Sequence, residues 1–365
     1  MPCREVIREQ IAFTSLVGLL VAFGYLTVEE AAAFVQVGIV ATYRIPLFPV
    51  YSRFDLGSLS LMQCWYELRF EMQDVERLRV NLRIPDVVRT RNGTVASGTE
   101  ALCLVLARLA YPCRWVQLVP RFGRSITHLS QLFNETIVFL DGTWQHLLAW
   151  PPALRSPAFL ATCSQQVAAA GAPLANCVGF LDGTLMSCAT PTQFEAVLFS
   201  GHKHEHGFKF QNVTMPNGLI VHQYGPHEGR RTDAYIFGIS GLRPLLQASL
   251  TVPFEEGYRL YADGGYALCN EVIVPFRRPT ATPAEMAFNT NMSHHRAAAE
   301  WSFANVASVF AFVDFEKNLR LLQQPIALYY RVATLLVNCR CCLYGNETSS
   351  HFQAPPPTLE AYLAM

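Results

Sequence analysis

The sequence lacks an excess of charge of either sign, because 28 Lys and Arg residues balance 28 Asp and Glu residues. A protein that binds DNA unaided draws most of its non-specific affinity from cationic contacts to phosphate. The neutral balance argues against strong DNA binding by the chain alone. Any role on DNA would therefore need a local basic face or a basic partner protein.

The N-terminus lacks an apolar run long enough to cross a bilayer. Ile11 to Leu26 carries no charged residue, but it falls short of the ~20 residues that a spanning helix needs. Two arginines precede it, yet Glu5 and Glu9 dilute the basic flank of a signal peptide, and no small-residue cleavage site stands out. A signal peptide and a short membrane span stay open as alternatives. The pattern favours a buried helix and no membrane partner.

A disulfide framework is also missing. The 11 Cys residues are odd in number and scattered through 365 residues, which indicates reduced thiols in an intracellular compartment. Charged residues make up 15% and apolar residues 51% of the chain. This composition is typical of a globular protein with a large core, and the length suits two domains.

The first part of the chain has helical patterns. We predict an N-terminal helical region over residues 1–60 and an all-helical domain over 61–157. Ser97-Gly98-Thr99-Glu100 matches a capping box, in which Ser caps an N–H and Glu reaches back. The helix behind it, a short helix, a Gly-containing turn and a helix from Ile126 outline a helix-turn-helix. A plain helical bundle remains an equal alternative. The polar face of the last helix offers Thr127, His128, Gln131 and Asn134.

The second part, residues 158–345, alternates strand and helix patterns and precedes a tail at 346–365. Val178 to Leu181 predicts a buried strand with Asp182 at its carboxyl end. Two β-rich runs flank the hairpin turn Pro216-Asn217-Gly218. A helix over 234–248, a strand over 258–263 that ends in Asp263, and a helix from 283 to about 312 follow. This order is that of an α/β, RNase H-like fold with a mixed sheet.

Four acids lie in distinctive settings within this pattern: Asp182, Asp233, Asp263 and Glu300. Acids that converge from separate elements suit a hard divalent cation, because Mg²⁺ takes oxygen ligands. We therefore expect a metal-dependent nuclease core behind the helical domain. Asp233 lies between a loop and a helix, so it is either a ligand or the helix N-cap.

A series of motifs occurs in order along this region. They resemble those of the Harbinger (PIF) transposases and of the nucleases domesticated from them, and the likeness extends over about residues 68–352. The motifs are Phe180-Leu181-Asp182-Gly183-Thr184, Gly201-His202-Lys203, Lys209-Phe210-Gln211, Pro216-Asn217-Gly218-Leu219-Ile220, Gly229-Arg230-Arg231-Thr232-Asp233-Ala234 and Ala299-Glu300-Trp301.

The resemblance implies a DDE-type endonuclease or transposase that uses two divalent metals, Mg²⁺ or Mn²⁺. Two such ions activate the attacking oxygen and neutralise the leaving one. The candidate catalytic residues are Asp182, Asp263 and Glu300, and Asp233 joins them as a metal ligand. The sequence departs from the family at Thr232, where relatives usually have His, and over Leu185 to Cys188, where they often carry a basic residue and a Pro.

Basic residues near the acids are the candidate DNA contacts, and ordinary solvated charges are the alternative. Arg296 lies one helical turn before Glu300, so it either steers a phosphate or pairs with that carboxylate. His202, His204 and His206 alternate, which predicts one polar side of an extended segment. The DNA-contact candidates are Lys203, Lys209, Arg230, Arg231 and Arg296.

The resemblance also implies a Myb-like partner protein that brings the chain to DNA and into the nucleus; a share in the cytoplasm stays open. So does the choice between a monomer and a homo-oligomer. Two functions compete with the endonuclease. One is a domesticated transposase that regulates at DNA without cleavage, and the other is a helical adaptor whose apolar N-terminus docks partners.

Overall fold

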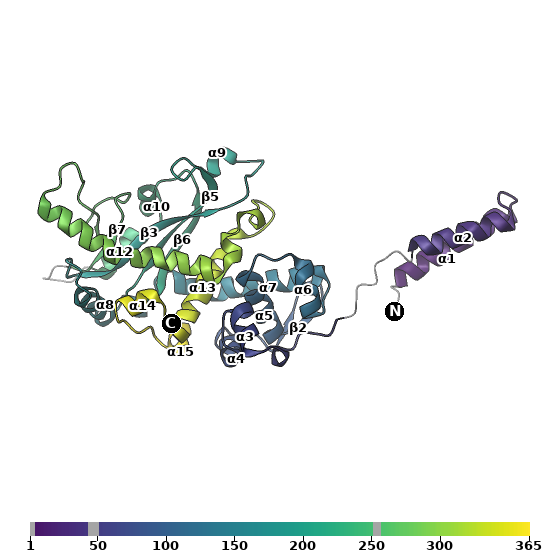
Figure 1. Cartoon of the computed structure of the whole chain (residues 1–365), viewed down its shortest axis with the longest axis horizontal. Coiled ribbons are helices and arrows are strands. Elements are labelled where there is room, and N and C mark those ends of the chain that lie inside the picture. Colours follow the sequence, from purple (N-terminus) through teal and green to yellow (C-terminus); the bar gives the residue numbers. More distant parts are fainter. Residues whose placement is uncertain (1–3, 43–50, 251–256) are drawn as a thin grey trace. The chain divides into compact units, whose positions relative to one another are not determined.

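The computed structural model describes residues 4–42, 51–250 and 257–365. It divides into two units, Met1–Tyr51 and Ser52–Met365 (Figure 1). In the first unit, α1 (Arg4–Ala22) and α2 (Val28–Thr42) form a helical hairpin. The predicted helix over the apolar N-terminus is confirmed, but its burial within this unit is not: Ile11 is 61% exposed and Leu16 55%. Two helices alone offer too few neighbours to cover both apolar surfaces.

The second unit begins with a largely helical region. It contains a small antiparallel hairpin, β1–β2, beside the helices. Its elements are η1 (Leu56–Ser58), α3 (Leu61–Leu68), α4 (Met72–Asn81), β1 (Val87–Arg89), β2 (Val95–Ser97), α5 (Gly98–Ala110), α6 (Trp115–Phe122), α7 (Ile126–Trp144), η2 (Gln145–Leu148) and η3 (Pro152–Arg155).

Helix α5 is the buried centre of this region. Ser97 caps it as predicted, since its hydroxyl accepts a hydrogen bond from the Glu100 N–H at 3.1 Å. The second half of the predicted capping box is wrong. The Glu100 carboxylate accepts from the Arg124 guanidinium instead, at 2.7 Å for one of two contacts, and both side chains are buried. An interior guanidinium offers a stronger partner than a single backbone N–H.

Helix α7, the expected second helix of the helix-turn-helix, is mostly packed inside the fold. Asn134 accepts a hydrogen bond from the Tyr329 hydroxyl at 2.8 Å, and Gln131 accepts one from Thr94 at 3.2 Å. Thr127 and His128 remain exposed at its N-terminal end. Half of its expected polar face therefore serves the bundle.

A six-stranded mixed sheet forms the rest of the second unit, as far as the described residues extend. Its strand order is β4-β5-β3-β7-β8, with β6 on β5; β3 pairs antiparallel with β5 and parallel with β7. The predicted α/β core with a mixed sheet is confirmed. The strands are β3 (Cys177–Ser187), β4 (Phe199–Ser200), β5 (Glu205–Thr214), β6 (Ile220–Glu228), β7 (Arg259–Ala262) and β8 (Val272–Ile273).

Helices cover both faces of this sheet. Phe180 and Tyr261 pack with α8 and α12, whereas Leu260 and Ala262 point into the larger core on the other face, as strand alternation requires. The predicted helix over 234–248 is two helices, because the chain turns at Gly241 with φ of +67°. The helices are α8 (Pro157–Ala169), α9 (Glu195–Leu198), α10 (Asp233–Ile239), α11 (Leu242–Leu250), α12 (Pro283–Val309), η4 (Ala311–Asp314), η5 (Glu316–Asn318), α13 (Ile326–Tyr344), α14 (Glu347–His351) and α15 (Leu359–Leu363).

Helix α13 joins the two parts of this unit, since it packs against both α7 and β6. Among the described residues, it is the one helix whose length and composition would allow it to span a membrane, and 67% of its apolar window is buried in the fold. Arg331 on α13 donates to both carboxylate oxygens of Asp141 on α7, at 2.7 and 2.8 Å. These contacts fix the sheet against the helical region.

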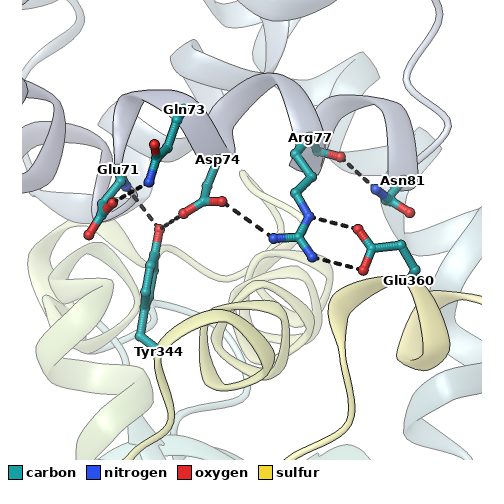
Figure 2. A network of polar contacts seen from close by, with 7 residues as sticks. All are labelled: Glu71, Gln73, Asp74, Arg77, Asn81, Tyr344 and Glu360. Carbon is teal, nitrogen blue, oxygen red and sulfur yellow. Dashed lines mark hydrogen bonds and ion pairs between the residues drawn. The ribbon is translucent and has the colours of Figure 1, made fainter.

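The end of the chain strengthens this attachment (Figure 2). The Tyr344 hydroxyl donates to Asp74 on α4 at 2.8 Å and accepts from the Glu71 N–H at 2.9 Å. Arg77 donates to both oxygens of Glu360 on α15, at 2.7 and 2.8 Å. The predicted tail at 346–365 thus carries two short helices and folds onto the rest of the unit.

Candidate functional site

The sheet register brings Asp182 and Asp263 to the same edge. In the parallel pair β3–β7, Leu181 lies opposite Ala262, the last residue of β7. The next residue of each strand is an acid, so both acids leave the pair together. The expectation that β3 ends before Asp182 is wrong, because β3 continues beside β5 as far as Ser187. Asp182 therefore sits at the step where β7 stops and β3 goes on.

On one face of this edge, α12 brings Arg296 and Glu300 to Asp182. The Arg296 guanidinium donates to Asp182 Oδ2 at 3.1 Å and to Glu300 Oε1 at 2.7 Å. The other oxygen of Asp182, Oδ1, accepts from the Gly183 N–H at 2.9 Å. Of the two roles predicted for Arg296, the structure shows pairing with carboxylates, and with two of them.

Asp233 lies beside Gly183. Because side chains alternate along a strand, a side chain at Gly183 would point to the surface of β3 opposite to that of Asp182. A Cβ placed on Gly183 would stand 2.7 Å from Asp233 Oδ1, so only glycine leaves room for that carboxylate. Asp233 accepts a hydrogen bond from Lys209 Nζ at 2.9 Å. The cap of α10 is Thr232, whose hydroxyl accepts from the Tyr235 N–H. The alternative of Asp233 as N-cap is therefore wrong.

All four acids line one cavity of about 370 Å³, which we call the acid cavity. Seven of the nine residues predicted as ligands or DNA contacts lie on its wall. The remaining lining comes from neighbouring parts of β3, from β4 and the turn after it, and from α12. The acid cavity is lined by Asp182, Gly183, Thr184, Leu185, Ser200, His202, Lys203, Lys209, Asp233, Asp263, Arg296, Glu300 and Phe303.

Burial makes Asp182 hard to ionise. Desolvation raises its pKa to about 6, Arg296 and the Gly183 N–H oppose this rise, and the charges of Asp263 and Glu300 add to it. Asp263 and Glu300 are thus close enough to Asp182 for their charges to repel its own. Two of the predicted ligands, Asp263 and Glu300, therefore raise the pKa of another, Asp182.

Tyr266 lies close to the acids, and the sequence analysis assigned it no role. Its ring is buried, and its hydroxyl, 3.3 Å from where a Gly183 Cβ would lie, has no hydrogen-bond partner among the described residues. Burial raises the pKa of this phenol well above its usual range, and Asp233, Asp182 and Asp263 add to the shift. The sequence offers one signal for it, the position three residues after Asp263.

Arg230 and Arg231 are not part of the cavity wall. Arg230 is exposed, and Arg231 donates to Glu228 at 2.9 and 3.1 Å and lies 4.4 Å from the centre of the Tyr235 ring. The prediction that His202, His204 and His206 lie on one side of an extended segment is wrong, because His202 and His204 lie in a turn before β5. A φ of +57° at His204 breaks the extended path.

The donor set suits a hard cation in kind. Carboxylate oxygens are the ligands that Mg²⁺ and Mn²⁺ prefer. A bound cation stabilises clustered carboxylates because it offsets their mutual repulsion. No group of three His, Cys, Asp or Glu side chains stands ready to hold an ion within the described ranges. Arg296 and Lys209 lie against three of the four acids instead. The residues fit a metal site whose acids are at present paired with basic side chains.

Residues 181–338 match the protein family described as DDE superfamily endonuclease. This segment is similar to the DDE superfamily endonucleases. The match spans all four acids, the strands β4 to β8 and most of β3, and helix α12. Comparisons with curated proteins and with solved structures found no match. The DDE endonuclease likeness thus covers the acid cavity and leaves the helical region outside it.

Proposed function

We propose that this chain is a divalent-metal-dependent DNA endonuclease of the transposase type, of the Harbinger subfamily, that cleaves phosphodiester bonds. The observation that carries the proposal is the acid cavity: four acids from β3, α10, the end of β7 and α12 line it within the DDE-like segment. Strand transfer to a second DNA site would use the same residues with a 3′-hydroxyl in place of water.

In this proposal Asp182, Asp233, Asp263 and Glu300 hold Mg²⁺ or Mn²⁺. When bound, such ions lower the pKa of the attacking oxygen and neutralise the leaving one. The pKa of Asp182 is raised to about 6, so at neutral pH this carboxyl is mostly ionised, as a metal ligand must be. Lys203 and His202 come from the turn before β5 and line the same cavity, where they would contact the DNA backbone.

The neutral charge of the chain bears on how it reaches DNA. We propose that a basic Myb-like partner delivers it to DNA and to the nucleus. Purified full-length protein should then bind DNA weakly at physiological salt, and tight, sequence-specific binding by the chain alone would contradict this dependence. Adding the partner should raise the affinity without changing the residues needed for cleavage.

A Mn²⁺ titration of the full-length protein tests the core of the proposal. Asp182→Asn keeps the size of the side chain and removes its charge, so Mn²⁺ affinity and nicking of supercoiled DNA should both fall at least tenfold. Glu316→Gln, which changes an exposed acid outside the acid cavity, is the matched control. Equal Mn²⁺ binding by wild type and Asp182→Asn would refute the metal site.

Glu300→Gln separates catalysis from folding. If Glu300 binds metal, the change abolishes cleavage and hardly affects the melting temperature, because Arg296 keeps Asp182 as a partner. A lower melting temperature with cleavage retained would make Glu300 a structural residue. Protein that binds Mn²⁺ and DNA yet never nicks would favour the second candidate, a domesticated transposase that acts without cleavage.

A further inference from the structure

Two basic side chains in the acid cavity already occupy carboxylate oxygens. Arg296 spans Asp182 Oδ2 and Glu300 Oε1, and Lys209 holds Asp233 Oδ1. The Arg296 side chain is 19% exposed and that of Lys209 16%. Both therefore lie within the site, and their charges offset acids that would otherwise repel one another.

The contacts of Arg296 are spread over two acids. Arg124 in the helical region gives two nitrogens to the two oxygens of one carboxylate, Glu100, whereas Arg296 gives one nitrogen each to carboxylates on different elements. A two-nitrogen fork on one carboxylate is the strong arrangement. Arg296 is thus held by two single contacts, each of which a competing cation can replace separately.

The oxygens that these bases occupy are ones that a metal would need. Both oxygens of Asp182 already accept a hydrogen bond, Oδ1 from the Gly183 N–H and Oδ2 from Arg296. A divalent ion that binds Asp182 through Oδ2 must share or take that oxygen from the guanidinium. The same holds for Asp233 Oδ1 and Lys209.

We infer that Arg296 and Lys209 are resident counter-ions of the acid cavity, which a divalent metal displaces and so frees to bind the substrate's phosphate. This inference rests on the proposed function. Both residues line the cavity, so a displaced side chain remains beside the ion and beside any phosphodiester that reaches it. A guanidinium matches two phosphate oxygens at once, and an ammonium binds one as a point charge.

A positioning role for Arg296 predicts the opposite sign. If Arg296 only held α12 and Asp182 in place for the metal, removing it would disorder the ligands and lower the metal affinity. If it competes with the metal, removing it strengthens metal binding, because no ion pair has to break and the cavity becomes more negative. The direction of the change therefore decides between the two roles.

The experiment measures Mn²⁺ affinity by calorimetry on the full-length protein without DNA, then DNA affinity at saturating Ca²⁺. Arg296→Met and Lys209→Met keep most of each side chain and remove its charge. We expect each to raise the Mn²⁺ affinity about three- to tenfold and to lower the DNA affinity about as much. Arg77→Met is the matched control, since Arg77 binds Glu360 and Asp74 outside the cavity.

Arg296→Lys gives a second test if Arg296→Met fails to fold. A single ammonium cannot span both acids in the same way, so the Mn²⁺ affinity of Arg296→Lys should be higher than that of wild type. Where Arg296→Met folds, the affinity of Arg296→Lys should also be lower than that of Arg296→Met. Unchanged or weaker Mn²⁺ binding in the folded variants would overturn the inference and leave the proposed function standing. Wild-type protein that binds no Mn²⁺ would instead refute the proposed function itself.

Discussion

Two arginines in this protein bind carboxylates in opposite ways. Arg124 and Glu100 lie in the closed interior of the helical region, where their side chains are 7% and 6% exposed. Arg124 also donates to the Val95 carbonyl at 2.8 Å. Arg296 faces a cavity in which it meets Asp182 and Glu300, and Glu300 is 59% exposed.

The difference lies in how completely each set of charges is matched. In the helical region one base meets one acid, and hydrogen bonds satisfy both groups. In the acid cavity four acids face Arg296, Lys209 and Lys203, and Asp182 remains hard to ionise although Arg296 touches it. We expect a matched buried pair to be costly to break, and an unmatched cluster to exchange partners more readily. The predictions below test whether this division holds.

The largest expected effect follows from breaking the closed pair. Arg124→Met leaves Glu100 buried without its cation, which typically costs about 3–5 kcal/mol of the free energy of unfolding. Urea denaturation of the full-length protein measures it. Arg77→Met, which breaks the half-exposed pair with Glu360, should cost less than about 1 kcal/mol. Equal costs for the two variants would erase the distinction between closed and open pairs.

A pH series distinguishes the buried interior of the fold from the acid cavity by the sign of their response. His222 on β6 is buried, and desolvation lowers its pKa to about 4 from 6.5. The unfolded chain therefore binds this proton first, so stability is full above pH 6.5 and falls as the pH drops towards 4, by roughly 3 kcal/mol in total. The raised pKa of Asp182 acts in the other direction: its contribution is largest below pH 4 and is lost as the pH rises through 6.

Replacing His222 isolates its share. Between pH 6.5 and 4, the free energy of unfolding of His222→Gln should fall by roughly 3 kcal/mol less than that of wild type. The measurement is urea unfolding at several pH values in metal-free buffer. Identical slopes in the two proteins would show that His222 gains a proton in the fold as readily as in the unfolded chain.

A third prediction uses two glycines beside the acids. In Gly183→Ala the new Cβ would lie 2.7 Å from Asp233 Oδ1, so the carboxylate must move, which is cheap for the fold and costly for a ligand. Mn²⁺ affinity should fall about tenfold, or about 1.4 kcal/mol, with little change in melting temperature. Gly264→Ala meets no atom within 4 Å and should change neither. Full Mn²⁺ affinity in Gly183→Ala would remove Asp233 from the proposed ligands.

Much of the sheet and of the placement of the acids could be predicted from the sequence, because local patterns determine them. The turn at Pro216-Asn217-Gly218 gave the hairpin β5–β6, and Pro283 gave the start of α12, which carries Glu300. Asp263 follows the last residue of β7, as the apolar run before it indicates. These features depend on neighbours in the chain, so periodicity and turn residues suffice.

The parts that could not be predicted depend on contacts between distant segments. The step at Asp182 arises because β5 pairs with β3 beyond the end of β7. The partner of Glu100 lies 24 residues away, so the local capping pattern was misleading. The hydroxyl of Tyr266 has no hydrogen-bond partner among the described residues, and this results from three-dimensional packing. No spacing in the sequence encodes these distances.

The smallest predicted effect comes from deleting one hydroxyl in the buried interior and one beside the acid cavity. Tyr362 on α15 is fully buried, and its oxygen accepts a hydrogen bond from Asn338 at 2.9 Å. Tyr362→Phe should lower the free energy of unfolding by about 1 kcal/mol, the usual net worth of such a bond. Tyr266→Phe removes a buried hydroxyl that has no partner in the part of the chain that the structure describes, so metal-free stability should stay the same or rise. If the Tyr266 hydroxyl contacts the ligand of the acid cavity, the same variant should bind Mn²⁺ or DNA severalfold more weakly.

Calorimetric melting of both variants, with and without Mn²⁺, measures the change in stability and the stabilisation that Mn²⁺ provides. A Tyr266→Phe variant that loses as much metal-free stability as Tyr362→Phe would place Tyr266 with the closed interior and not with the cavity.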